Sequence, residues 1–193
     1  MTYFHNFTAP IWEIFYGNLL LLCCSLFYLV WWIETFRPNA KTGGPVGVIC
    51  LTAAFLTGIA AIALLSAGIN SLSHQSKSLP VRFILIGGAV LYFILLLVTA
   101  GAFHRIATSE LIIMHIWAVL ELSVIIVLYG TGHFGTGRAV ILAALVGVAT
   151  ISGLICYVLY YRLSAMASYW DGMVPLASDA LVMAVLLGML TVS

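Results

Sequence analysis

The chain has 193 residues, of which 64% are hydrophobic and 7% are charged, and its net charge is +1. An ordinary soluble domain carries roughly 25% charged residues. A soluble fold of this length would therefore lack the polar side chains needed to cover its surface, so the composition indicates an integral membrane protein in a lipid bilayer. No basic stretch is present, and no nucleic-acid partner is expected.

Six apolar runs are long enough to cross a bilayer, which takes about 20 residues for a helix. In chain order they cover residues 11–33, 46–69, 81–103, 111–129, 139–161 and 174–192. The connections are short and rich in turn-forming residues, which leaves no room for a soluble domain. A transmembrane barrel would show alternating segments instead of continuous runs. The sequence predicts an all-α, multi-pass bundle of six transmembrane helices, with residues 1–193 forming a single transmembrane domain.

Prolines and small residues add detail to this bundle. Pro45 precedes the second run, and Pro175 predicts that the last helix begins near residue 174, because proline is tolerated in a first helical turn. Small residues four apart allow helices to approach closely in lipid. Such pairs occur at Ala149/Gly153 and in the series Ala180/Ala184/Gly188. They predict contacts within the bundle, with a second copy in a homo-oligomer, or with partner membrane subunits.

The fourth run, 111–129, carries the most informative residue. Glu121 lies almost at its centre, where a charge costs about 2.5–3.5 kcal/mol on insertion scales. This carboxyl group must therefore be protonated, paired or in contact with water. By helical periodicity, Glu110, Met114, Trp117 and Glu121 share one stripe, whereas His115 points to a different neighbour.

Other ionisable residues concentrate on one half of the predicted bundle. Asp171 is expected just before the last helix, where its charge suits the positive N-terminal dipole. Asp179 is expected in the first turns of that helix. Together with the fourth run, these residues predict a polar half-cavity. The candidate substrate- or ion-binding residues are Glu121, His115, Asp179, Glu110, Trp117 and Asp171.

A metal or haem site has weaker support. His104, His115, Asp171 and Asp179 are the candidate ligands, but no HExxH pattern is present, so no metal is assigned and the cofactor stays unknown. Cys156, like the other three cysteines, lies in an apolar run and is interpreted as a small buried hydrophobe. Aromatic residues near the same half, including Tyr160, Tyr161, Tyr169 and Trp170, suit an interfacial belt or the lining of an entry to a site.

Three functions remain open on the sequence alone. A small transporter or channel, proton- or cation-coupled and acting on a small molecule or ion, is favoured, because a titratable group in mid-membrane suits ion coupling. The alternatives are a non-catalytic membrane subunit of a larger complex and a membrane-embedded metal or haem enzyme. A bacterial or archaeal plasma membrane is the expected location. The residues match no family pattern that would decide among these functions.

Overall fold

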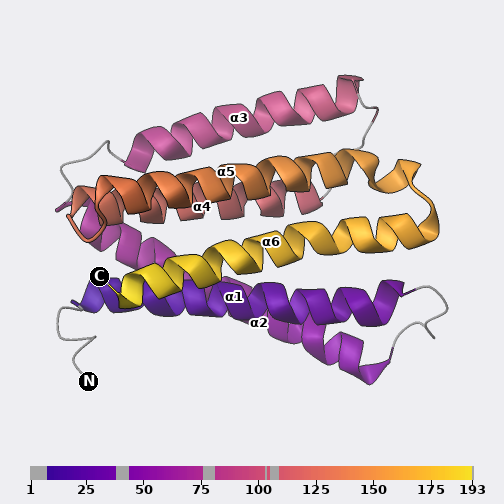
Figure 1. The fold of residues 1–193 in the computed structure, drawn as a ribbon, viewed down its shortest axis with the longest axis horizontal. Coiled ribbons are helices and arrows are strands. Elements are labelled where there is room, and N and C mark those ends of the chain that lie inside the picture. Colours follow the sequence, from indigo (N-terminus) through magenta and orange to yellow (C-terminus); the bar gives the residue numbers. More distant parts are fainter. Residues whose placement is uncertain (1–7, 38–43, 76–80, 103, 105–108, 193) are drawn as a thin grey trace.

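The computed structural model describes residues 8–37, 44–75, 81–102, 104 and 109–192. Within these ranges the chain is all-α and contains no strand (Figure 1). The helices are α1 (Ala9–Phe36), α2 (Pro45–Ser73), α3 (Val81–Ala102), α4 (Ser109–Gly130), α5 (Thr136–Leu159) and α6 (Ala165–Thr191), with a 3-10 turn, η1 (Tyr160–Arg162), between the last two.

All six α-helices are long and apolar enough to cross a membrane, which confirms the predicted six-helix bundle. A helix satisfies its own backbone hydrogen bonds, as hydrocarbon requires. Large apolar side chains such as Phe55, Phe93 and Leu97 are exposed on the outer surface, with 64–70% of their area accessible. Such a surface suits lipid rather than water, and the protein is an integral, multi-pass membrane protein.

Successive helices run in opposite directions, so the helix ends gather at two ends of the bundle (Figure 1). The start of α1 and the end of α6 lie at one end, here called the termini end. The last residue of α5 and the first residue of α6 lie at the other, here called the pocket end after the pocket described below.

Five helices close a ring of contacts and the sixth lies outside it. Helix α1 packs along α2 and α6, α5 packs against α4 and α6, and α2 reaches α4. Helix α3 packs chiefly on α4 and stands apart from the other helices in Figure 1. Consequently α4 is the most enclosed helix, with 56% of its most apolar stretch buried.

One of the two small-residue series forms a close contact within the chain, whereas part of the other is exposed on the surface. Ala149 and Gly153 are both buried, and a Cβ added at Gly153 would lie 2.6 Å from the Met114 sulfur of α4. In the series on α6, Ala184 and Gly188 are exposed, and a Cβ at Gly188 would meet open space. The expected close approach is thus confirmed for α5 against α4, whereas this part of α6 faces outward.

Helix α6 begins well before the residue predicted for it. The polar stretch that precedes Val174 reads as a connection, but it is helical from Ala165 onward, and Pro175 lies inside the helix rather than at its start. The indole of Trp32 on α1 packs on Gly172, and its Nε1 donates a hydrogen bond of 3.0 Å to the Tyr169 carbonyl. This docking against α1 supports helical turns that local composition alone does not favour.

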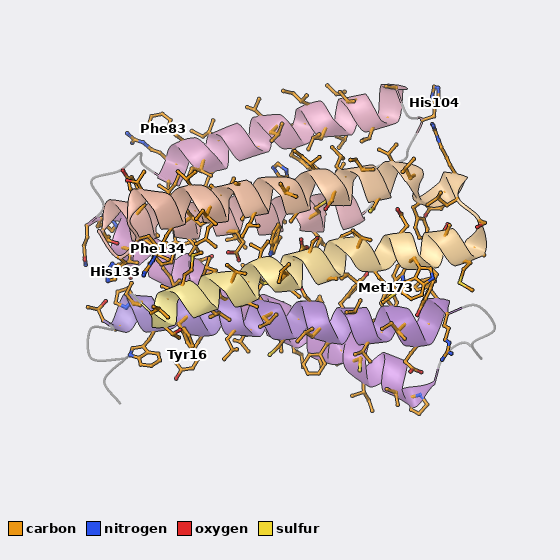
Figure 2. All side chains as sticks on the ribbon, viewed as in Figure 1. Tyr16, Phe83, His104, His133, Phe134 and Met173 are labelled. Atoms are coloured by element: carbon orange, nitrogen blue, oxygen red, sulfur yellow. The ribbon has the colours of Figure 1, made fainter. Side chains whose placement is uncertain are left out.

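The turn between α4 and α5 closes the termini end. Gly132 has a φ of +82°, which glycine adopts at little cost. The Phe134 amide donates to the Leu128 carbonyl at 3.1 Å, and the Phe134 ring is 2% exposed. Figure 2 shows Phe134 and its neighbour His133 at this end. Partial burial lowers the pKa of His133 below its ordinary value of 6.5.

Candidate functional site: an acid pair in mid-membrane

Glu121 is the most unusual side chain of the bundle interior. It lies near the middle of α4 and is 0% exposed. Neither of its carboxyl oxygens has a hydrogen-bond partner within the described ranges of the chain. A buried polar group without a partner costs free energy of several kcal/mol in hydrocarbon. The Glu121 carboxyl is therefore a costly group at this position.

Asp179 is the electrostatic neighbour of Glu121. The sequence places Asp179 in the first turns of a shorter last helix, near one membrane face. Because α6 starts at Ala165 and ends at Thr191, Asp179 instead lies close to the centre of the helix. The side chain is only partly exposed. The structure thus brings two candidate acids from separate helices to one level in the middle of the bundle.

Among the residues that the structure describes, no basic side chain lies at this depth to neutralise the pair. The described basic residues lie at or just beyond the ends of helices: Arg37, Arg82, Arg138 and Arg162. Like charges in a medium of low dielectric repel each other strongly. The charge of the acid pair must therefore be balanced by a proton, a cation or water.

The His115 side chain contacts α3. Its Nε2 atom lies 2.7 Å from the Gly88 carbonyl of α3, and its ring packs 5.6 Å from the ring of Tyr92. Since a carbonyl only accepts, Nε2 carries the hydrogen. His115 faces α3 whereas Glu121 interacts with α6, in agreement with the helical spacing. The imidazole joins two helices.

Trp117 lies on the same face of α4 as Glu121, one turn nearer the pocket end. Its indole is 5% exposed, and its Nε1 donor has no acceptor in the described part of the chain. Met114, a further turn along this face, lies against Gly153 of α5. Glu110 belongs to the same stripe and to α4, but its side chain lies outside the described residues.

Asp171 lies in the second turn of α6 and is partly exposed. Its carboxyl group forms a hydrogen bond with the Cys156 thiol of α5, and its Oδ2 atom has no partner among the described residues. Sequence reasoning missed Cys156, because an isolated cysteine in an apolar run carries no signal of a polar neighbour. The extra turns of α6 bring Asp171 alongside α5.

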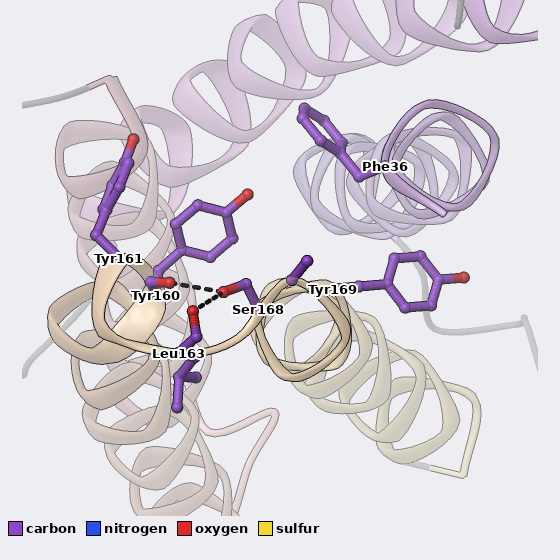
Figure 3. A pocket seen from close by; sticks show the side chains of 7 residues that line it. Phe36, Tyr160, Tyr161, Leu163, Ser168 and Tyr169 are labelled. Atoms are coloured by element: carbon purple, nitrogen blue, oxygen red, sulfur yellow. Dashed lines mark hydrogen bonds between the residues drawn. The ribbon is translucent and has the colours of Figure 1, made fainter. Parts of the chain in front are cut away.

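An open pocket of about 350 Å³ lies at the pocket end (Figure 3). Ser168 and Tyr160 both line this pocket, and the Ser168 hydroxyl donates a hydrogen bond of 2.7 Å to the Tyr160 carbonyl. Aromatic rings dominate the lining, which comprises Phe36, Tyr160, Tyr161, Leu163, Ala165, Ser168 and Tyr169. Tyr160, Tyr161 and Tyr169, which the sequence assigned either to an interfacial belt or to the entry of a site, thus line a pocket.

The proposed metal ligands do not converge. Within the described residues, no group of three or more His, Cys, Asp and Glu side chains is placed to hold a metal ion. His104 follows α3 in a connection, with a φ of 53°, while His115 is bonded to α3. Asp171 and Asp179 are eight residues apart on α6, about 12 Å along its axis.

Comparison with known proteins assigns no family. No family model, no curated protein and no solved structure matches the chain. What can be concluded about function therefore depends on the acid pair and its surroundings.

Proposed function

We propose that the protein moves protons or small monovalent cations across the membrane, as a small transporter or channel, and that Glu121 and Asp179 bind the ion in mid-membrane. The observation that carries the proposal is a fully buried carboxyl group without a hydrogen-bond partner, next to a second carboxyl group. Intramembrane acids are costly and typically mark ion or proton pathways.

The charge balance of the site supports a cationic occupant. With no Lys or Arg of the described ranges at this depth, the empty pair carries up to two negative charges in a medium of low dielectric. A proton or a cation held between the two carboxyl groups reduces that charge and supplies the partner that the Glu121 oxygens lack. The loaded site is then less costly to keep in hydrocarbon than the empty one, so ion binding and conformation are coupled.

The size and composition of the chain fit this activity. The described residues consist almost entirely of membrane-crossing helices, and the exposed surface of those helices is apolar. An ion gradient is therefore the energy source that the described part of the chain could use directly. A small molecule carried along with the ion is compatible with the open aromatic pocket at one end.

Flux through reconstituted protein tests the proposal. Purified protein is inserted into vesicles that enclose a pH-sensitive dye, a potential is imposed, and proton entry is followed with and without a sodium gradient. We expect Glu121→Gln and Asp179→Asn to reduce ion flux to near the level of protein-free vesicles, because each removes a carboxylate that binds the ion.

Glu34→Gln is the matched control, since it makes the same chemical change at an exposed acid near the end of α1. Its flux is expected to equal that of the unmodified protein. Unchanged flux in Glu121→Gln, or no ion movement by the unmodified protein under either gradient, would contradict the proposal. Retained thermal stability of the variants in detergent separates loss of function from loss of fold.

A membrane subunit of a larger complex is the second candidate. The outward face of α6, with Leu181, Ala184 and Gly188 exposed, is the observation that favours it. Small residues on such a face allow another helix to approach closely. Reproducible co-purification of another chain after mild extraction, lost on Ala184→Leu and Gly188→Leu, would favour this function over transport.

A further inference from the structure

The two halves of the bundle differ in how they separate the acid pair from water. Towards the termini end, the space between α4, α5 and α6 is filled by apolar side chains that are 0–2% exposed, from these helices and the turn after α4: Val124, Leu128, Phe134, Leu142, Leu186 and Leu190. Closely packed apolar side chains leave no partners for water. Between α4, α5 and α6 this half is closed, and the buried atoms of this half that lack a partner among the described residues, Glu13 Oε2 and Asn18 Oδ1, lie on α1.

Towards the pocket end, the space between α4, α5 and α6 contains polar groups instead. The Trp117 indole nitrogen and Asp171 Oδ2 are buried atoms without a hydrogen-bond partner in the described ranges. The Cys156 thiol is hydrogen-bonded to the Asp171 carboxyl. Buried polar atoms of this kind are normally satisfied by water or by a ligand.

These polar groups lie along one seam between α4, α5 and α6. Asp171, Pro175 and Asp179 are each four residues apart and therefore share one side of α6. A Cβ at Gly153 would lie 2.6 Å from the Met114 sulfur and 3.7 Å from Pro175 Cβ, so the three helices meet at this level. Pro175 also has no N–H to donate to the Asp171 carbonyl, so one helical hydrogen bond is missing at this level of α6.

We propose that Glu121 and Asp179 are reached from the pocket end only, along this seam, with Asp171 as an intermediate carrier and the flexible Met114 side chain as the constriction. The inference depends on the proposed ion-binding role of the acid pair. A proton taken up from water by the Asp171 carboxylate leaves it again for bridging water and then protonates an Asp179 or Glu121 carboxylate, so no other reactant is needed. The interval of about 12 Å between the two aspartates requires such water.

One-sided thiol labelling tests the route without relying on flux. Cys23, Cys24 and Cys50 are replaced by alanine, and sealed vesicles are exposed to a charged, membrane-impermeant methanethiosulfonate. The thiol sulfur displaces a sulfinate, forms a mixed disulfide and releases its proton to water. Exposed control positions identify the face that is reached: Ser164→Cys at the pocket end and Thr136→Cys at the termini end.

We expect native Cys156, and a cysteine in an Asp179→Cys variant, to react from the same side as Ser164→Cys. Leu186→Cys, in the closed half, is expected to stay unmodified from either side. Met114→Ala is expected to speed the modification of the Asp179→Cys thiol, because it removes the constriction. Reaction of this thiol from the side of Thr136→Cys, or no reaction of either Cys156 or Asp179→Cys from the pocket end, overturns the route.

Flux measurements complete the test of Asp171. Asp171→Asn is expected to lower flux and to remove one step from its dependence on pH, with Asp171→Glu restoring both, which a purely structural role would not produce. An unchanged pH profile overturns the carrier role. If the reagent enters from the pocket end while Glu121→Gln leaves the flux unchanged, the proposed function is contradicted and the route is supported. The reverse result leaves the ion site intact and removes the route.

Discussion

Helices α3 and α4 are nearly identical in length and hydropathy, yet they occupy opposite environments. Each has 22 residues, and their most apolar stretches have mean hydropathies of 2.6 and 2.5. In α4, 56% of that stretch is buried, compared with 11% in α3. Hydropathy identifies both as membrane spans but does not show which one faces lipid.

The polar residues account for the difference between these helices. Helix α4 contains His115, Glu121 and Ser123, and all three are buried. In α3 the buried residues are Gly88 and Thr99, and Thr99 donates its hydroxyl to its own helix. A helix with ionisable groups at mid-depth must turn them away from lipid, and the surrounding helices then enclose it. The few polar atoms, rather than the many apolar ones, determine which helix is central.

Cavity formation is the largest expected effect in this comparison. Leu128 on α4 is 0% exposed, whereas Leu97 on α3 is 70% exposed. We expect Leu128→Ala to lower the free energy of unfolding by about 2 kcal/mol, near the low end for buried leucine because lipid is itself apolar. Leu97→Ala should change it by less than about 0.5 kcal/mol. Reversible unfolding in mixed micelles measures both, and equal effects would mean that α3 is as enclosed as α4.

The contact between the two helices offers a second test through adjacent glycines. A Cβ at Gly88 would lie 2.6 Å from Val119 Cγ2 of α4, whereas a Cβ at Gly87 would meet nothing within 4 Å. Gly88→Ala is expected to cost about 1 kcal/mol, at the low end for overpacking. Gly87→Ala is the matched control and should be neutral within about 0.5 kcal/mol. If both variants unfold alike, α3 does not pack on α4 through this face.

The hydrogen bond from His115 to α3 should contribute less. Interhelical hydrogen bonds in membranes average about 0.6 kcal/mol, and we expect His115→Leu to lower stability by a similar amount. Ion flux should be retained, since the imidazole faces away from the acid pair. Loss of flux without loss of stability would instead restore His115 to the ion pathway.

The smallest expected effect concerns the turn that ends α4. Burial lowers the pKa of His133, so the unfolded chain binds a proton more readily than the folded one. This contribution to stability is fully present above about pH 6.5 and is lost as the pH falls below that value. His133→Gln should flatten that part of the curve of melting temperature against pH. A steeper curve in the variant would show that the sign is wrong.

The membrane class, the number of spans and most helix positions followed from composition and run length, because hydrocarbon imposes both. The start of α6 did not follow, since Ser168, Asp171 and Gly172 resemble a connection until the Trp32 indole is placed on them. With that start misplaced, Asp179 was expected near one membrane face rather than in mid-membrane. Its position beside Glu121 depends on how two helices pack, and no spacing within either helix encodes it.

The first turn of α1 and the last turn of α6 lie at the same end of the bundle. A peptide linker could therefore join two copies head to tail while staying in one aqueous compartment. In such a fused dimer, Glu121→Gln could be introduced into one half alone. Half of the original flux would indicate independent pathways, and a complete loss would indicate that neighbouring copies conduct together.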